Sequence, residues 1–298
     1  MTRILVTGAS GFIGSALVEA LAGQGLTVRA AYRALPAARC FPDQIAVGDL
    51  GPATDWGRAL EDVSHIVHLA GPAHRRAKEA EYRRAIVEGT AALAEQAERA
   101  GAKRFVFMSS IKAAAERGGP VSEQDLPAPE SLYGKAKLEA EGHVLARSAL
   151  APVVLRPPLV HAPNVRGNFA LLLRLADTPV PLPLGGIRNL RSFIARETLI
   201  AAILAVLGAN RGPSGLFHIA DHPACSTSEL VALLRQGMGR SERLFHAPAL
   251  SAVLPRVLTE NLEVDDSAFR AAYSYGARAD ADARQELVRC GAAWRNAR

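Results

Sequence analysis

The sequence predicts an α/β protein built on a doubly wound parallel sheet, and three observations support this. Short apolar runs rich in β-branched residues alternate with segments of helical periodicity through the first half of the chain. The first run leads at once into a glycine-rich turn that opens a helix. After Arg156, proline becomes frequent, which favours loops and short elements. We therefore expect a Rossmann-type dinucleotide-binding domain over residues 1–156. A smaller, mainly substrate-binding lobe should follow over residues 157–298, with some of its segments returning to the sheet.

The first strand and the turn after it carry the clearest local signal. Ile4–Thr7 reads as a buried parallel strand, and Phe12–Gly23 has the apolar spacing of a helix. Between and within them, Gly8 allows a sharp turn and Gly11 lets the backbone approach a pyrophosphate, while Gly14 lets the helix pack closely. The free N–H groups at the helix start would then face the phosphates. A packing turn is the alternative, but the strand–turn–helix context favours a dinucleotide site.

The remaining elements follow the same alternation. Strands are expected at Thr27–Tyr32, Ile45–Val47, His65–Leu69, Phe105–Ser109 and Val153–Arg156, and helices at Lys78–Ala100, Ser131–Leu150, Glu197–Leu207 and Ser228–Met238. An open doubly wound sheet binds its ligands beyond the carboxyl ends of the strands, so the smaller lobe should cover that edge. The last stretch, Asp280 to Arg298, is weakly patterned, and we expect it to be loosely held.

Composition excludes several classes of function. The net charge is +6, but the arginines are scattered and no dense basic run with interleaved aromatics predicts nucleic-acid binding. No apolar run is long enough to span a bilayer, and no signal peptide precedes the first strand, so no membrane association is expected. The three cysteines are widely spaced, which fits a cytoplasmic protein without disulfides. The histidines show no pair at metal-ligand spacing, so no metal is expected.

A second group of residues predicts redox chemistry. Ser109 and Ser110 end the fifth strand, and Tyr133 and Lys137 lie four residues apart, on one face of a helix. An ammonium near a phenol favours the phenolate, so Tyr133 is expected to exchange protons closer to neutral pH. Ser110 would hydrogen-bond to the substrate oxygen with which Tyr133 exchanges its proton. Proton transfer at oxygen together with hydride transfer at carbon interconverts an alcohol and a ketone.

The Tyr-x-x-x-Lys spacing alone is common by chance, and its bland alternative is an exposed tyrosine packed beside a lysine stem. The glycine turn and the serines at a strand end make the catalytic interpretation the better one.

With these motifs, the chain resembles the extended short-chain dehydrogenase/reductases, the NAD-dependent epimerase/dehydratase family that includes UDP-glucose 4-epimerase. The resemblance covers the whole chain. It is carried by Thr7 to Gly14, Gly48-Asp49-Leu50, His68-Leu69-Ala70-Gly71, Ser109-Ser110, Tyr133 to Lys137 and Arg156-Pro157-Pro158.

The resemblance implies a catalytic triad of Ser110, Tyr133 and Lys137. It also implies that Asp49 and Leu50 meet the adenine and that Pro157 flanks the nicotinamide. The full cofactor site that it implies is Gly8, Ser10, Gly11, Phe12, Ile13, Gly14, Tyr32, Arg33, Asp49, Leu50, Leu69, Ala70, Gly71, Ser109, Tyr133, Lys137 and Pro157.

Part of the second half resembles one branch of the family, which contains 4-ketoreductases of UDP-linked N-acetylated deoxyhexoses (the UDP-N-acetylquinovosamine branch) beside 4-epimerases. Asn168-Phe169, Pro181 to Gly185 and Arg188 to Phe193 carry this likeness. It implies that Arg191 and Asn168, together with Ser110, bind the substrate, a UDP- or dTDP-sugar. Surface ion pairing is the alternative for Arg191.

Three departures from the family pattern bear on specificity. Tyr32 and Arg33 stand where an NAD-specific enzyme usually has an acidic residue, and a cation there suits a 2′-phosphate, so NADP is slightly favoured over NAD. The alternative is that Arg33 stacks on the adenine or points into water. Ile86 replaces an asparagine that often supports the active-site loop. The loop from Pro72 to Lys78 is short and basic, and Tyr273-Ser274-Tyr275-Gly276 lacks the usual tryptophan.

The sequence therefore predicts an NAD(P)-dependent oxidoreductase or epimerase acting at C4 of a nucleotide-linked hexose. Two alternatives remain, an NADPH-dependent ketoreductase of a non-sugar ketone and a non-catalytic NADP-binding redox sensor. Relatives often pair through helices of the cofactor domain, so a homodimer through Lys78–Ala100 and Ser131–Leu150 is a further possibility.

Overall fold

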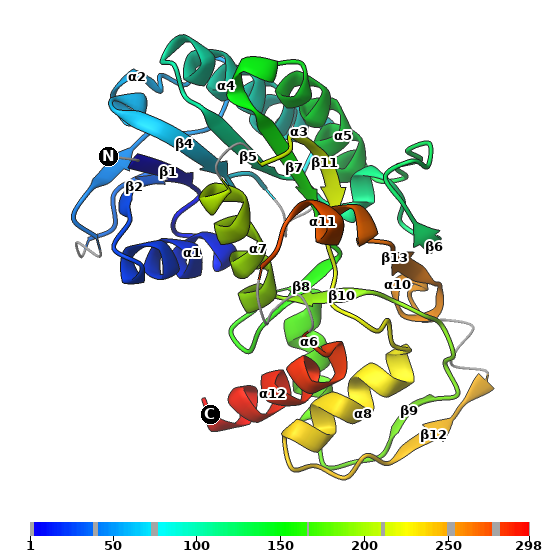
Figure 1. The fold of residues 1–298 in the computed structure, drawn as a ribbon. Coiled ribbons are helices and arrows are strands. Elements are labelled where there is room, and N and C mark those ends of the chain that lie inside the picture. The colour runs from blue at the N-terminus through cyan, green and yellow to red at the C-terminus, as the bar shows by residue number, and fades with distance from the viewer. Residues whose placement is uncertain are drawn as a thin grey trace.

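The computed structural model describes residues 3–37, 41–72, 77–165, 167–209, 212–248, 254–275 and 281–297. Its centre is a seven-stranded sheet in the order β11-β7-β5-β4-β1-β2-β3, with every neighbouring pair parallel (Figure 1). The strands are β1 (Arg3–Thr7), β2 (Thr27–Tyr32), β3 (Gln44–Ala46), β4 (Val63–His68), β5 (Arg104–Met108), β7 (Pro152–Arg156) and β11 (Gly215–His218). The predicted class, a Rossmann-type doubly wound α/β sheet, is confirmed.

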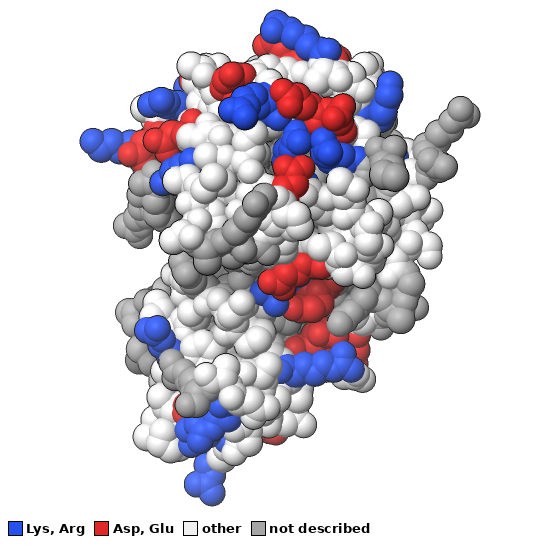
Figure 2. Space-filling model, turned by 90° about the vertical axis from the view of Figure 1, so that its left-hand side faces the viewer, with Lys and Arg blue, Asp and Glu red and all other residues white. Residues whose placement is uncertain are grey.

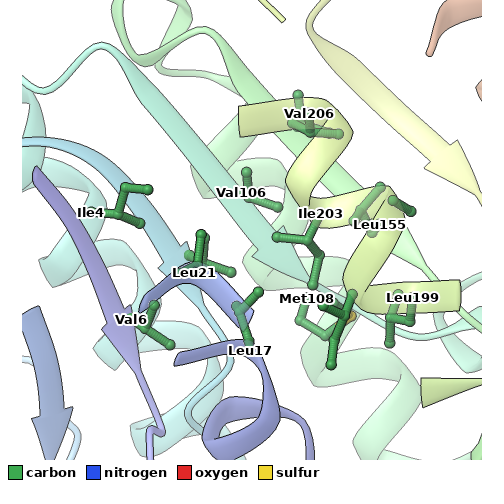
Figure 3. Packing of buried hydrophobic residues seen from close by; sticks show 14 of the residues in the cluster. Ile4, Val6, Leu17, Leu21, Val106, Met108, Leu155, Leu199, Ile203 and Val206 are labelled. Carbon is green, nitrogen blue, oxygen red and sulfur yellow. The ribbon is translucent and has the colours of Figure 1, made fainter. Parts of the chain in front are cut away.

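Helices cover both faces of this sheet, which explains why its strands are apolar on both sides. One face packs against α1 (Phe12–Gly23) and α7 (Arg196–Gly208). Figure 3 shows leucines of α1 and aliphatic residues of α7 meeting Ile4, Val106 and Leu155 of the strands. The other face packs against α2 (Gly57–Leu60), α4 (Gly89–Arg99) and α5 (Leu132–Leu145).

The observed elements refine the expected ones. The helix α1 and the strand β2 have the predicted bounds. The long helix expected at Lys78–Ala100 is three segments, α3 (Glu79–Tyr82), a π-helix η1 (Arg83–Glu88) and α4. The helix expected at Ser131–Leu150 ends earlier, as α5, and a 3₁₀ turn η3 (Ser148–Leu150) follows it.

The second half builds a smaller assembly below the sheet in Figure 1 and sends β11 back into the sheet beside β7. Three parallel strand pairs form in it or join it to the first half: β8 (Leu159–His161) with β10 (Phe193–Ala195), β9 (Leu182–Gly185) with β12 (Leu244–His246), and β6 (Gly118–Val121) with β13 (Leu262–Val264). Its helices are α6 (Asn168–Ala176), α8 (Thr227–Gly237), α10 (Arg256–Thr259), α11 (Ser267–Ala272) and α12 (Ala283–Asn296). The division into two domains at residue 156 stays a prediction.

The expectation of a loosely held C-terminal stretch is wrong for its described part. The helix α12 lies along α8, and Leu287, Cys290 and Trp294 are buried in a shared core. The two backbones approach closely because Gly237 and Gly291 lie at the contact, where an added Cβ would come within 2.0 Å of the Val288 carbonyl and 2.3 Å of the Leu234 carbonyl. The apolar residues recur at helical spacing, a pattern that becomes persuasive only once the facing helix is known.

The surface carries mixed charge. On the face in Figure 2, basic and acidic side chains are interspersed over the upper part of the view rather than gathered by sign. Within the described ranges, no helix combines the length and hydropathy that a bilayer crossing needs. The same residues contain no cluster of His, Cys, Asp or Glu arranged to hold a metal ion. Cys225 and Cys290 are buried free thiols, while Cys40 lies outside the described residues.

Candidate active site

A cleft of about 850 Å³ opens at the carboxyl ends of β1, β2 and β4. Predicted cofactor residues that line it are Gly8, Ser10, Gly11, Tyr32, Arg33, Asp49, Leu50, Leu69, Ala70 and Gly71. Its other lining residues, which were not among the predicted cofactor residues, are Thr7, Ala31, Val47, Gly48, Trp56, Pro72, Glu81, Arg84 and Ala85. The place of the cleft is the one that an open doubly wound sheet provides for ligands.

The glycine turn at the base of the cleft has room only for glycine. Gly8 has a φ of +68°, and the N–H of Gly11 donates to the Gly8 carbonyl at 2.8 Å. An added Cβ on Gly14 would lie 2.1 Å from the Gly8 carbonyl oxygen. The helix α1 then starts at Phe12 without a side-chain cap and without acidic residues in its first turn. Its first N–H groups are therefore available to phosphate oxygens, so the turn fits a dinucleotide.

A buried hydrogen-bond chain shapes the opposite wall. The N–H groups of Leu69 and Ala70 both donate to the Thr7 hydroxyl oxygen at 3.2 Å. Because its lone pairs are used, the Thr7 O–H donates to Nδ1 of His68 at 2.7 Å, and Nε2–H of His68 donates to Thr90 at 3.1 Å. Burial, with a smaller effect from Lys137, lowers the pKa of His68 to about 3, so the imidazole is neutral. These hydrogen bonds hold the Leu69-Ala70 segment in place.

The adenine end of the cleft carries an exposed ion pair. Nε of Arg33 lies 3.3 Å from Oδ1 of Asp49, and the two side chains are 81% and 78% exposed. Such a pair is weak, and its guanidinium can exchange the carboxylate for a phosphate. A second arginine, Arg84 on η1, lines the same cleft, with its side chain against Gly51.

The three residues of the predicted triad lie together beneath the sheet's carboxyl edge. The Ser110 side chain lies near enough to the Tyr133 hydroxyl to affect its pKa, and Nζ of Lys137 lies 5.9 Å from the centroid of the Tyr133 ring. The Lys137 ammonium donates to the Met108 carbonyl at 2.7 Å and lies 4.5 Å from the Phe107 ring centroid. None of the three triad residues lines the cleft described above.

Local structure explains how Ser110 and Tyr133 meet. The Ser131 hydroxyl caps α5 by accepting from the N–H of Gly134 at 3.1 Å, so Tyr133 lies in the first turn. Ser110 caps the short helix η2 (Ile111–Ala113) by accepting from the N–H of Lys112 at 3.3 Å. The two elements touch at Gly134, where an added Cβ would lie 2.3 Å from the Lys112 carbonyl oxygen.

The protonation expected for Tyr133 differs from what the structure indicates. Burial and the nearby Tyr82, whose ring packs edge-on at 6.0 Å between centroids, raise the pKa of Tyr133 above its usual value. The hydrogen bond from Ser110 opposes this only in part. Burial also lowers the pKa of Lys137 to about 8, against the opposing charge of Glu141. Since the ammonium is directed at a backbone carbonyl, the resting Tyr133 is protonated and not shifted toward phenolate.

Other predicted cofactor residues lie outside the cleft wall. Phe12 faces the Arg196 guanidinium at 5.2 Å, and Ile13 packs against the hydrophobic core. The Ser109 hydroxyl is buried and donates to Glu141. Pro157 is buried beside the triad, where its carbonyl accepts from the N–H of Ile111 at 2.9 Å.

The predicted substrate residues lie on separate parts of the second half. Asn168 is exposed at the start of α6. Arg191 is partly buried, forms a backbone bridge with Cys225 and donates from Nη1 to the Glu260 carbonyl at 3.0 Å. Burial lowers the pKa of Arg191. The contacts of the described residues do not connect Arg191 to Asn168.

The departures from the family pattern have structural outcomes where they are described. Ile86 is buried in the π-helix η1, and a Cβ added to Gly71 would lie 3.7 Å from its side chain. Tyr273 and Tyr275 belong to a buried aromatic cluster around Phe269. Residues 73–76 of the short basic loop and Gly276 lie outside the described residues.

Comparisons with known proteins agree with the fold. The model of the NAD dependent epimerase/dehydratase family matches residues 4–220. Over 245 residues the chain is 36% identical to a UDP-glucose 4-epimerase of Vibrio cholerae, covering 76% of this chain and 73% of that relative. It is 30% identical to a ceramide reductase of Caulobacter vibrioides, covering 88% and 77% of the two chains. The solved structure of MoeE5 in complex with UDP-glucuronic acid and NAD has a TM-score of 0.79 at 28% identity, covering 99% of both chains. The chain therefore belongs to the NAD dependent epimerase/dehydratase family and is an enzyme of the extended short-chain dehydrogenase/reductase type that uses NAD or NADP.

Proposed function

We propose that this enzyme transfers hydride at C4 of a nucleotide-linked hexose, with Tyr133 as the acid/base. The observation that carries the proposal is the grouping of Ser110, Tyr133 and Lys137, with Nζ of Lys137 5.9 Å from the Tyr133 ring centroid, in a chain 36% identical to a UDP-glucose 4-epimerase. The bound nicotinamide would supply or accept the hydride.

The residues have distinct roles in this proposal. A protonated Tyr133 donates its proton to the substrate oxygen as negative charge develops there, and Ser110 orients that oxygen. With a pKa of about 8, Lys137 is mostly charged at neutral pH, and its ammonium stabilises the phenolate left after the proton has moved. The raised pKa of Tyr133 favours the reductive direction as the first step, since a general acid must hold its proton at rest.

At the substrate end, we propose that Arg191 and Asn168 bind the diphosphate of a UDP- or dTDP-sugar. An arginine suits this role because its planar fork matches phosphate oxygens. The pairing of Nη1 with a carbonyl leaves other N–H groups of Arg191 for such a contact. The homodimer through α4 and α5 stays a prediction.

The decisive experiment is a screen of UDP-, dTDP- and GDP-sugars with NADH and NADPH, in which the consumption of the reduced cofactor is measured. Turnover of a 4-keto sugar nucleotide with exchange of cofactor identifies a reductase, whereas tightly retained NAD with interconversion of C4 epimers identifies an epimerase. Tyr133→Phe should reduce turnover by about 10²–10⁴-fold, the usual contribution of a general acid. Unchanged turnover in Tyr133→Phe would instead support a binding or sensor role.

Cofactor preference is tested separately. We propose that Arg33 reads the 2′-phosphate of NADP, because it lines the cleft and its only charged partner among the described residues is the exposed Asp49. Arg33→Ala should then weaken NADPH binding more than NADH binding. An equal loss for both cofactors would show that Arg33 does not contact the phosphate.

A second candidate is a ketoreductase of a non-sugar ketone, which the 30% identity to a ceramide reductase favours. A thermal shift with UDP separates the two, because only an enzyme that binds the nucleotide gains stability from it. No shift with UDP, together with reduction of a lipid-like ketone, would favour the second candidate.

A further inference from the structure

A buried ion pair joins the helix of the triad to the central sheet. Glu141 of α5 and Arg156 of β7 form a two-armed contact, with Nε to Oε1 at 2.9 Å and Nη2 to Oε2 at 2.6 Å. The two residues are 1% and 2% exposed. Replacing a buried pair by apolar residues is often neutral or stabilising, so folding stability alone does not account for these charges.

The pair is the centre of a longer network. The Ser109 hydroxyl donates to Oε1 of Glu141. On the other side, Nη1 of Arg156 lies 3.5 Å from Nε2 of His218, whose Nδ1–H donates to the Val121 carbonyl at 3.1 Å. With Nδ1 as donor to a carbonyl, the neutral ring offers Nε2 as an acceptor to Arg156. The backbone N–H of His218 donates to Glu123 at 2.6 Å, which extends the network to the segment after β6.

Three members of the network lie next to residues of the predicted site. Glu141 lies one helical turn beyond Lys137, and Ser109 immediately precedes Ser110. Arg156 immediately precedes Pro157, whose carbonyl accepts from the N–H of Ile111. The network therefore ties together the three segments that carry Ser110, Lys137 and Pro157.

The electrostatic setting of Lys137 depends on few charges. The titratable groups around it are Tyr133 and Glu141 on α5 and His68 on β4, and its hydrogen bond goes to the neutral Met108 carbonyl. His68 is neutral and Tyr133 is protonated at rest, so Glu141 supplies the negative charge that favours the ammonium. Burial works in the other direction.

We propose that Glu141 and Arg156 are positioning residues for the reaction: the pair sets the place of Ser110, and the Glu141 carboxylate keeps Lys137 charged at neutral pH. The inference rests on the proposed function for its kinetic consequences. It makes a second claim, about the ionisation of Lys137, that holds whatever the substrate is.

The first test is kinetic and uses Glu141→Gln, which keeps the shape but removes the charge. We expect kcat to fall about tenfold or more with KM changed less than threefold, and the basic limb of the kcat profile to move about one pH unit lower. Glu141→Asp, which keeps the charge, should restore the limb. The control is Glu98→Gln, which breaks the 2.7 Å contact of Glu98 with Arg147 just beyond the far end of α5 and should leave the profile unchanged.

The second test needs no substrate. In protein labelled with ¹³C at the lysine Cε, the resonance of Lys137 is assigned by its loss in Lys137→Met and titrated against pH. Glu141→Gln should lower its midpoint by about one pH unit, as expected for losing one nearby charge. An unchanged midpoint overturns the proposal, and a lowered midpoint in a protein that turns over no sugar nucleotide leaves it standing while the proposed function fails.

If Glu141→Gln does not fold, the double variant Glu141→Gln, Arg156→Met is used in its place, because it leaves no buried unpaired cation. If the positioning role is right, this variant folds but keeps the lower kcat and the shifted Lys137 midpoint. A folded double variant with the kcat and midpoint of the unaltered protein would show that the pair is only structural.

Discussion

Adding a single methyl group at Gly134 should separate Ser110 and Tyr133, the two residues that we propose hold the substrate oxygen. An added Cβ would lie 2.3 Å from the Lys112 carbonyl oxygen, whereas ordinary contacts begin at 3.4 Å. In Gly134→Ala, α5 and η2 must therefore move apart by about 1 Å, the difference between these two distances. Tyr133 precedes Gly134 and Ser110 caps η2, so the same movement carries the two side chains apart and breaks their interaction.

The expected cost follows from that displacement. A misplacement of about 1 Å costs about 10²-fold in rate. This corresponds to about 2.7 kcal/mol in the activation free energy, at about 1.36 kcal/mol per tenfold. The free energy of unfolding should fall by about 1–3 kcal/mol from overpacking, less the small gain of alanine over glycine in a helix.

Two quantities are measured: kcat with the substrate found in the sugar-nucleotide screen, and the free energy of unfolding in urea. The matched control is Gly142→Ala on the same helix, where an added Cβ meets nothing within 4 Å. That variant should keep its kcat and gain up to about 1 kcal/mol in stability. If Gly134→Ala keeps its kcat within threefold, the contact between α5 and η2 does not set the triad geometry.

Three further outcomes are expected. Lys137→Ala should lower turnover and weaken cofactor binding in a fluorescence titration, and unchanged rate and affinity would contradict its role. The pKa of His68 is 6.5 unfolded and about 3 folded, so the unfolded chain binds more protons between these pH values and stability falls on acidification through that window, by up to about 1.4 kcal/mol per pH unit. Urea unfolding of His68→Gln should lack this contribution to the slope, and an identical slope would show that the imidazole is not buried neutral. Arg104→Met removes a buried guanidinium that donates to four backbone carbonyls, and should cost about 3 kcal/mol in urea unfolding. A cost below about 1 kcal/mol would mean that water satisfies those carbonyls.

The local parts of the fold could be predicted because their signals are local. The bounds of α1 follow from the glycine turn before it and the apolar spacing within it. The meeting of Tyr133 and Lys137 follows from their spacing of four residues on a helix, and the serine at the end of β5 follows from the end of an apolar run. The proximity of Ser110, Tyr133 and Lys137 could therefore be predicted from local signals.

What could not be predicted depends on residues far apart in the chain. Thr7 and His68 are 61 positions apart, and His68 and Thr90 are 22 apart, so no local pattern signals their hydrogen-bond chain. The helix α12 is stable because α8 lies against it, which its own weak pattern does not reveal. The protonation of Tyr133 differs from the prediction because burial and Tyr82 act on it in three dimensions, while the sequence displays only the lysine.

The close approach of Gly14 to the Gly8 carbonyl has a consequence for redesigning this enzyme. Main-chain atoms form the floor on which the dinucleotide would rest, so this floor is insensitive to exchange of side chains elsewhere. If the lobe after Pro157 binds the substrate, as the sequence predicts, a mutational library confined to its loops would vary what the enzyme accepts while its dinucleotide stays the same. Selection for new substrates could then proceed without changes to the glycine turn that would bind the dinucleotide.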